Sequence, residues 1–83
     1  MAIKPQNILI MDDFFSDTYK MIGIALKKRR IEMNLTQKQL SEMTGKIDRS
    51  KISDIENGKE DFLFSTLLKL CKALDISTAD ILK

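Results

Sequence analysis

Residues 30–59 read RIEMNLTQKQLSEMTGKIDRSKISDIENGK, and this stretch decides the fold. Within it, Thr36 is followed three residues later by Gln39, which is a capping-box pattern and predicts the start of a helix. Leu40 and Met43 then supply the apolar stripe of a short helix. The stretch therefore opens with a helix that begins at about residue 36.

A second short helix is expected after a tight turn. Gly45 is expected to end the first helix, and Asp48 can cap the next one, which we place at about residues 49–56. Ile52 and Ile55 share its inward face. Two short helices joined by a turn at a glycine match the helix-turn-helix pattern, in which the second helix enters the major groove of DNA.

The first 17 residues show no helical period. They contain Pro5 and the apolar run 8–11, and we expect residues 1–17 to form an extended arm. Ser16 or Asp17 can then cap a helix that leads into the quoted stretch. One face of that helix is expected to carry Ile22, Leu26 and Arg30.

Two further helices are expected towards the C-terminus. The first spans about residues 63–74, with an apolar stripe of Phe64, Leu67, Leu68, Cys71 and Leu74. In the last, Ser77 with Asp80 repeats the capping pattern before Ile81 and Leu82. The residues expected to stop helices are Asn34, Gly45, Asn57 with Gly58, and Asp75.

Length and composition limit the class of protein. With 83 residues the chain forms one domain at most, which we place at residues 18–83 behind the arm. No apolar run approaches the roughly 18 residues of a membrane span and no secretory signal is expected, so we expect a cytoplasmic protein. With no histidine and Cys71 as the only cysteine, the sequence predicts no disulfide, metal site or cofactor and weighs against an enzyme. We interpret Cys71 as a small core residue rather than a redox switch.

The positive charge is concentrated in the middle of the chain. The whole chain has a formal net charge of +2, whereas residues 20–59 alone carry about +5. Such an excess suits the neutralisation of phosphates, although a solvated basic face without a partner explains it equally well.

The outward side of the second short helix is polar and basic. With about 100° per residue and the buried face centred between Ile52 and Ile55, Ser50 and Asn57 point outward. The outward and flanking positions together are Arg49, Ser50, Lys51, Ser53, Asp54 and Asn57. Short polar side chains of this kind hydrogen-bond base edges and phosphates.

Over residues 20–82 the chain resembles the Cro and lambda-repressor (XRE-like) type of helix-turn-helix regulator. The most specific matches are Leu35-Thr36-Gln37 with Leu40, Ile52-Ser53, Ile55-Glu56-Asn57-Gly58, Leu67-Leu68-Lys69-Leu70 and Ile76-Ser77. The resemblance implies an all-α, five-helix lambda-repressor-like domain. One departure is Lys46, an added residue in the turn that could tilt the second helix; another is Phe62-Leu63, where the family often has a proline and a small polar cap.

The resemblance also implies a function, that of a transcriptional regulator, most simply a repressor. It would bind a palindromic operator in double-stranded DNA as a homodimer, through a recognition helix at about residues 48–57. The implied DNA-binding residues are Thr36, Gln37, Arg49, Ser50, Lys51, Ser53, Asp54, Asn57 and Lys59.

Within this set, Gln37 would hold a phosphate at a helix N-terminus, and Arg49 is the first candidate for reading guanine. Asn57 and Lys59 would contact phosphates, with a helix-stop role as the alternative for Asn57. Asp54 would either accept from cytosine or pair with a neighbouring side chain of its own helix.

Glu56 is expected to be structural. In the related phage repressors the equivalent glutamate pairs with an arginine of the first helix, which here is Arg30. Because burying one charge without the other is costly, the two residues are expected to depend on each other.

A protein-binding role is the alternative function. The same fold serves adaptors and antitoxins, whose main partner is another protein such as a toxin. The apolar run 8–11 suggests that residues 1–15 contribute to a dimer interface or to a protein contact. The alternative dimer interface is the end of the fourth helix with Ile81 and Leu82, as in many phage repressors.

Overall fold

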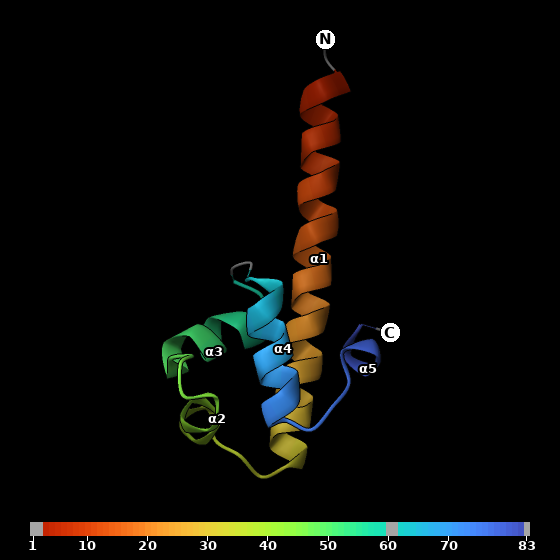
Figure 1. Cartoon of the computed structure of the whole chain (residues 1–83). Coiled ribbons are helices and arrows are strands. Elements are labelled where there is room, and N and C mark those ends of the chain that lie inside the picture. The colour runs from red at the N-terminus through yellow and green to blue at the C-terminus, as the bar shows by residue number, and fades with distance from the viewer. Residues whose placement is uncertain (1–2, 60–61, 83) are drawn as a thin grey trace.

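A computed structural model describes residues 3–59 and 62–82, and their side chains from residue 15 onward. The elements are α1 (Ile3–Glu32), α2 (Gln37–Thr44), α3 (Arg49–Glu56), α4 (Phe64–Ala73) and α5 (Thr78–Ile81). Figure 1 shows α2, α3, α4 and α5 gathered around the C-terminal half of α1. The described residues contain no strand, and the expected all-α, five-helix fold of the lambda-repressor type is confirmed.

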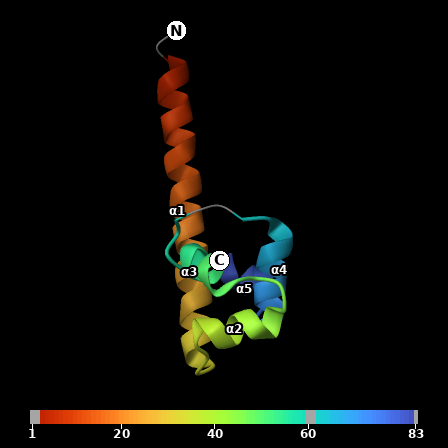
Figure 2. The ribbon, with the colours of Figure 1, turned by 90° about the vertical axis from the view of Figure 1, so that its left-hand side faces the viewer.

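The N-terminal segment differs from the expectation. Residues 3–17 are helical and belong to α1, so the extended arm and the cap at Ser16 or Asp17 are wrong. Pro5 does not prevent this helix, because it stands in the first turn, where a backbone N–H has no partner within the helix. The N-terminal half of α1 extends well beyond the other four helices (Figures 1 and 2). The division of the chain into residues 1–17 and a domain at residues 18–83 stays a prediction.

The expected helix stops are confirmed. Asn34 and Asp75 adopt positive φ angles of 59° and 49°, and Gly45 and Gly58 adopt 74° and 65°. This left-handed conformation turns the chain out of a helix, and glycine and asparagine tolerate it best. Each of the four residues follows a helix, so short local signals in the sequence set the lengths of α1 to α4.

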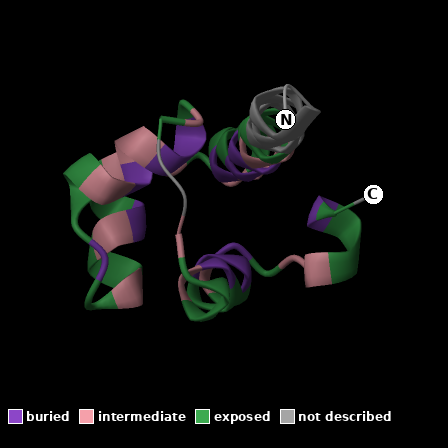
Figure 3. Cartoon of the chain, turned by 90° about the horizontal axis from the view of Figure 1, so that it is seen from above, coloured by how far each residue is buried: buried purple, intermediate pink, exposed green. Residues whose placement is uncertain are grey.

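The core lies between α1 and the other helices. Its buried apolar residues are Ile22, Leu26, Leu40, Ile47, Ile52, Ile55, Leu67, Leu70, Cys71, Leu74 and Ile81. Seen from above, the buried faces of the helices turn towards one another (Figure 3). Three residues expected on apolar stripes, Met43, Phe64 and Leu68, are exposed instead. The buried side of α4 is centred on Leu67, Leu70 and Cys71, which turns Phe64 and Leu68 away from the core. Among the described helices none is both long and apolar enough to cross a membrane.

Candidate nucleic-acid interface

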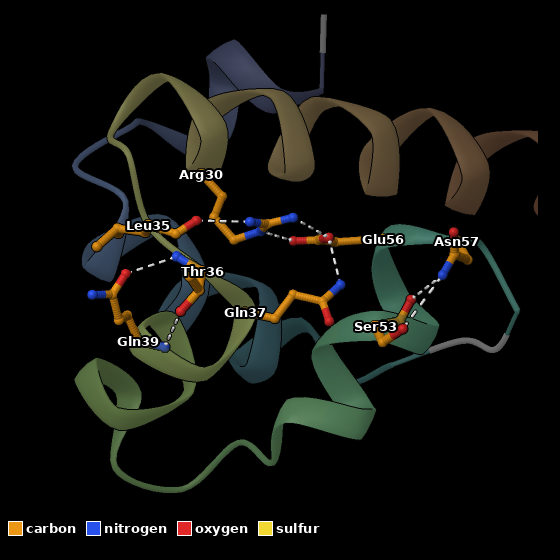
Figure 4. Close-up of polar contacts among 8 residues, drawn as sticks. All are labelled: Arg30, Leu35, Thr36, Gln37, Gln39, Ser53, Glu56 and Asn57. Carbon is orange, nitrogen blue, oxygen red and sulfur yellow. Dashed lines mark hydrogen bonds and ion pairs between the residues drawn. The ribbon is translucent and has the colours of Figure 1, made fainter.

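The helix-turn-helix unit begins at a complete capping box. The hydroxyl of Thr36 accepts a hydrogen bond from the backbone N–H of Gln39 at 3.0 Å, and the Gln39 side chain accepts one from the N–H of Thr36 at 2.8 Å. These two bonds satisfy backbone donors that the helix itself leaves unpaired. The start of α2 is therefore fixed by two residues only three positions apart in the sequence, as expected (Figure 4).

The turn between α2 and α3 is tied to α2 by side chains. The Ser41 hydroxyl donates to the carbonyl of Ile47 at 2.6 Å, and the Thr44 hydroxyl accepts from the Ile47 N–H at 3.2 Å. Ile47 is buried between these contacts, whereas the added residue Lys46 is exposed. Asp48 occupies the N-cap position of α3 but makes no capping hydrogen bond with its side chain, so the expected Asp48 cap is wrong in that respect.

Arg30 of α1 and Glu56 of α3 form a buried ion pair. The Nε and Nη2 atoms of Arg30 donate to the two carboxylate oxygens of Glu56 at 2.6 and 3.0 Å. The Nη1 atom of Arg30 donates to the carbonyl of Leu35 at 2.7 Å, just before α2. The guanidinium group thus joins the end of α1, the entry to α2 and the end of α3 in one fork, a geometry that only arginine provides.

Gln37 enters the same network from the first turn of α2. Its Nε2 atom donates to Glu56 Oε1 at 3.0 Å (Figure 4). Glu56 therefore accepts from α1 and from α2 at once, and the first turn of α2 is held against the end of α3. The sequence-based interpretation considered Gln37 as a phosphate contact or as a solvent-facing residue and missed this link, because residues 19 positions apart show no local signal for it.

The residues expected to face DNA lie at the surface of this unit. Thr36, Arg49, Ser50, Asn57 and Lys59 are exposed, and Gln37, Lys51, Ser53 and Asp54 are half-buried. Ile52, Ile55 and Glu56 form the buried side of α3. The structure therefore brings the predicted residues together on the outer side of α2 and α3 and in the segment that follows.

Asn57 has a local role in addition. At the C-cap of α3 its Nδ2 atom donates to the Ser53 carbonyl at 2.8 Å and approaches the Ser53 hydroxyl at 3.4 Å. The backbone N–H of Lys59 bonds to the carbonyl of Asp54 at 2.9 Å. These bonds close the last turn of α3, which is the helix-stop role considered for Asn57.

Lysines from three elements meet beside the N-terminal end of α3. Lys46 in the turn, Lys51 on α3 and Lys69 on α4 line one shallow depression together with Asp48 and Thr66. Lys69 was not among the expected DNA-binding residues, because only the packing of α4 brings it near α3. Three lysines and one aspartate leave the lining of this depression with a net positive charge, which suits an anionic partner such as a phosphate.

Cys71 belongs to the core and not to a site. It is buried on α4, and its burial raises the pKa of the thiol, while a hydrogen bond with the side chain of Thr78 acts in the opposite direction. A raised pKa keeps the thiol protonated and therefore unreactive at neutral pH. Within the part of the chain that the structure describes, no group of histidine, cysteine or acidic residues is arranged to hold a metal ion.

Comparisons with known proteins agree with this geometry. The helix-turn-helix family model designated HTH_3 matches residues 26–81, and the chain belongs to that family. No curated protein sequence matches the chain.

Three solved structures share the fold. The clp gene regulator ClgR from C. glutamicum has a TM-score of 0.74 and 28% identity, covering 78% of this chain and 82% of ClgR. The restriction-modification controller C.AhdI from Aeromonas hydrophila has a TM-score of 0.71 and 30% identity over 76% of this chain and 94% of its own. The controller C.Esp1396I, solved as a tetramer with its natural 35 base-pair operator, has a TM-score of 0.70 and 26% identity, covering 77% of this chain and 83% of its own.

Family and fold together define a helix-turn-helix DNA-binding transcriptional regulator of the XRE type.

Proposed function

We propose that this regulator is a repressor that binds a palindromic operator as a homodimer, with α3 as the recognition helix. The observation that carries the proposal is the position of α3 in the structure. Its inner side is fixed by Ile52, Ile55 and the Arg30–Glu56 pair, while its N-terminal residues Arg49 and Ser50 are exposed. A rigid helix with free polar residues at its N-terminal end suits insertion into a major groove.

Arg49 is the proposed base-reading residue. It is exposed at the first position of α3, where an arginine can donate two hydrogen bonds to O6 and N7 of guanine. Ser50, Ser53 and Asp54 follow on the outer side of the helix and supply shorter polar contacts. Lys51 stands beside them as a phosphate contact.

Phosphate contacts are proposed on both sides of α3. Thr36 and Gln37 stand at the N-terminus of α2, where backbone N–H groups and the helix dipole favour an anion. The bond from Gln37 to Glu56 uses one of the two N–H bonds of its amide, so the other can reach a phosphate. Asn57 and Lys59 supply contacts on the far side.

A homodimer follows from the size of the recognition unit. One helix-turn-helix reads only a few base pairs, so proteins of this kind commonly dock as dimers on half-sites about one helical turn apart. C.Esp1396I was solved as a tetramer on its operator, which supports assembly of more than one copy on DNA. As a DNA-binding regulator the protein would act in the cytoplasm, and no catalytic role is proposed.

A protein-binding function is the second candidate. The exposed apolar side chains on α1 support a protein contact of some kind. The similar structures are regulators of genes and of restriction-modification systems, and they give no support to a toxin as the partner.

The proposal is tested by selecting a duplex from random sequence and measuring the affinity of variants for it and for unrelated DNA. Arg49→Ala should weaken the selected site by roughly 1–3 kcal/mol, and unrelated DNA by less. Lys59→Ala is the matched control: it should weaken both duplexes about equally and reduce the salt dependence of binding. If Arg49→Ala leaves discrimination unchanged, Arg49 is not the reading residue, and if no duplex is enriched, sequence-specific binding is wrong.

A further inference from the structure

The outer face of α1 exposes an apolar row. Met21, Ile24 and Ile31 are 49%, 66% and 54% exposed, although residues of the same helix, Ile22 and Leu26, are buried in the core. Ile24 and Ile31 also line a shallow hollow on this face together with Lys27, Lys28 and Glu32. Large apolar side chains gathered on one exposed face usually mark a surface that binds a partner.

The row has the spacing of a coiled-coil seam. Asp17, Met21, Ile24, Lys28 and Ile31 follow one another at intervals of four, three, four and three residues, and all five are exposed. Alternating intervals of three and four keep side chains on one stripe of a helix and are typical of the a and d positions of a heptad. In the sequence, Ile10 and Phe14 continue the same register towards the N-terminus of α1. At 100° per residue this stripe lies opposite the core-facing side of the helix.

We infer that the partner on this face is a second copy of the chain, paired through α1 in the antiparallel direction. The argument is charge complementarity. In the antiparallel register that brings Met21 against Ile24 of the second copy, Asp17 meets Lys28 of the second copy, and the same contacts recur about the two-fold axis. The position of Phe14 then falls opposite Ile31, so apolar positions meet apolar positions and each carboxylate meets an ammonium group.

The parallel arrangement lacks this match. In a parallel pair each seam residue faces its own equivalent, so Asp17 would oppose Asp17 and Lys28 would oppose Lys28. Like charges held face to face are unfavourable. The sequence of the seam therefore selects the antiparallel pair, which the apolar residues alone would not do.

The antiparallel pair also suits the placement of α3. On one flank of α1, Gly23 lies against the carbonyl oxygens of Ile55 and Glu56 in α3. On the other flank, Ala25, Arg29 and the seam residue Lys28 line a hollow beside α5. The seam lies on the outer side of α1 between these flanks, with Lys28 at its α5 edge, so a two-fold axis that relates antiparallel α1 helices runs from the α3 flank to the α5 flank. Both α3 helices then lie on the same side of the dimer.

The other exposed apolar residues offer a weaker interface. Leu63, Phe64 and Leu68 at the start of α4 and Leu82 after α5 are exposed, but within the described residues these positions do not form a heptad row like that on α1. The alternative C-terminal interface comprises the end of α4, Ile81 and Leu82. Of these, Ile81 is buried in the core of its own domain and is not available for a partner. A C-terminal dimer is therefore the competing outcome of the experiment.

The first experiment measures self-association of the full chain without DNA by sedimentation equilibrium at low salt. Asp17→Lys should raise the dimer dissociation constant at least about tenfold, since like charges replace the complementary pair twice per dimer. Adding Lys28→Asp in the same chain should restore the constant to within about threefold of the wild type. Absence of this rescue, with both variants still helical by circular dichroism, would overturn the antiparallel register.

The second experiment separates this face from the C-terminal one. Ile24→Glu should raise the dissociation constant at least about 100-fold, because each dimer would bury the introduced carboxylate twice. Leu82→Glu, an equally drastic change at another exposed apolar position, should leave the constant within about twofold. The reverse pattern contradicts the inference. A wild-type chain that stays monomeric at about 100 μM contradicts it as well, because even a weak dimer should form at that concentration. The inference rests on the proposed homodimer and adds its interface. Because self-association is measured without DNA, failure of this interface is distinguishable from failure of operator recognition.

Discussion

Glu56 holds three parts of the helix-turn-helix unit together. Its carboxylate accepts from Arg30 through two bonds and from Gln37 through a third, and its side chain is nearly inaccessible to solvent. These three hydrogen bonds offset the desolvation free energy of the buried carboxylate, whereas burying either charge without its partner would be strongly unfavourable. The position of α3 therefore depends on the whole network.

This dependence is testable by a double-mutant cycle with Arg30→Met and Glu56→Met. Each single change should lower the free energy of unfolding by about 3–5 kcal/mol, because it leaves one buried charge unpaired. The double change should cost less than the sum of the two, which is the sign of coupling. The measurement is urea unfolding of the wild type and the three variants.

A cycle between Lys27→Met and Glu56→Met supplies the control. Lys27 is exposed on α1, one turn from Arg30, and should show a coupling energy near zero. A coupling energy near zero for Arg30 and Glu56 as well would show that the ion pair does not contribute to the free energy of unfolding.

Among the helices, α1 approaches α3 closely at Gly23. A Cβ atom on Gly23 would overlap the carbonyl oxygen of Ile55 and lie 2.9 Å from that of Glu56. Both obstacles are backbone atoms in the last turn of α3, which cannot rotate away as a flexible side chain would. A glycine in the middle of a long helix lowers helix stability, and here its lack of a side chain permits the contact.

Gly23→Ala should therefore destabilise the protein although alanine favours helices. We expect a loss of about 1–3 kcal/mol in the free energy of unfolding from the forced separation of α1 and α3. The separation would also stretch the Arg30–Glu56 pair, so operator binding should weaken. Urea unfolding and DNA binding of the same variant measure the two effects.

Lys27→Ala, an exposed change on the same helix, should leave stability within about 0.5 kcal/mol of the wild type. A Gly23→Ala variant as stable as this control would show that the two helices do not meet as closely as the structure has them.

At the scale of the whole molecule, α1 has two halves with different surroundings. Its C-terminal half forms one side of the core and contributes Ile22 and Leu26 to it. Its N-terminal half projects beyond the domain (Figure 2). The family match begins at residue 26. Folding of the domain should therefore not require the first 15 residues, whereas these residues should strengthen the dimer.

Deletion of residues 1–15 tests this division. The truncated chain should unfold in urea at nearly the wild-type midpoint, because its core is intact. Its dimer dissociation constant should rise by about tenfold, since the position opposite Ile31 in the seam is lost while those from Asp17 to Lys28 remain. Unchanged self-association would show that residues 1–15 take no part in the interface, and complete loss would show that the seam is not centred between Met21 and Ile24.

The sequence by itself determined the class of fold and the place of the helix-turn-helix unit. These depend on local interactions: the capping box at Thr36, the left-handed residues Asn34, Gly45 and Asp75, and apolar residues spaced for one buried face. Each of them acts within a few residues of the chain, so each is visible in a short window of sequence.

Only the tertiary structure decided the rest. Residues 3–17 carry too few regularly spaced apolar residues to predict a helix from the sequence, yet they continue α1, because nothing in them breaks a helix that is already anchored at its other end. The bond from Gln37 to Glu56 and the approach at Gly23 join residues that are far apart in the chain. The exposure of Ile24 and Ile31 depends on which face of α1 the other helices cover. Periodicity identifies the apolar residues of a helix, but the packing of its neighbours decides which of them remain open to a partner.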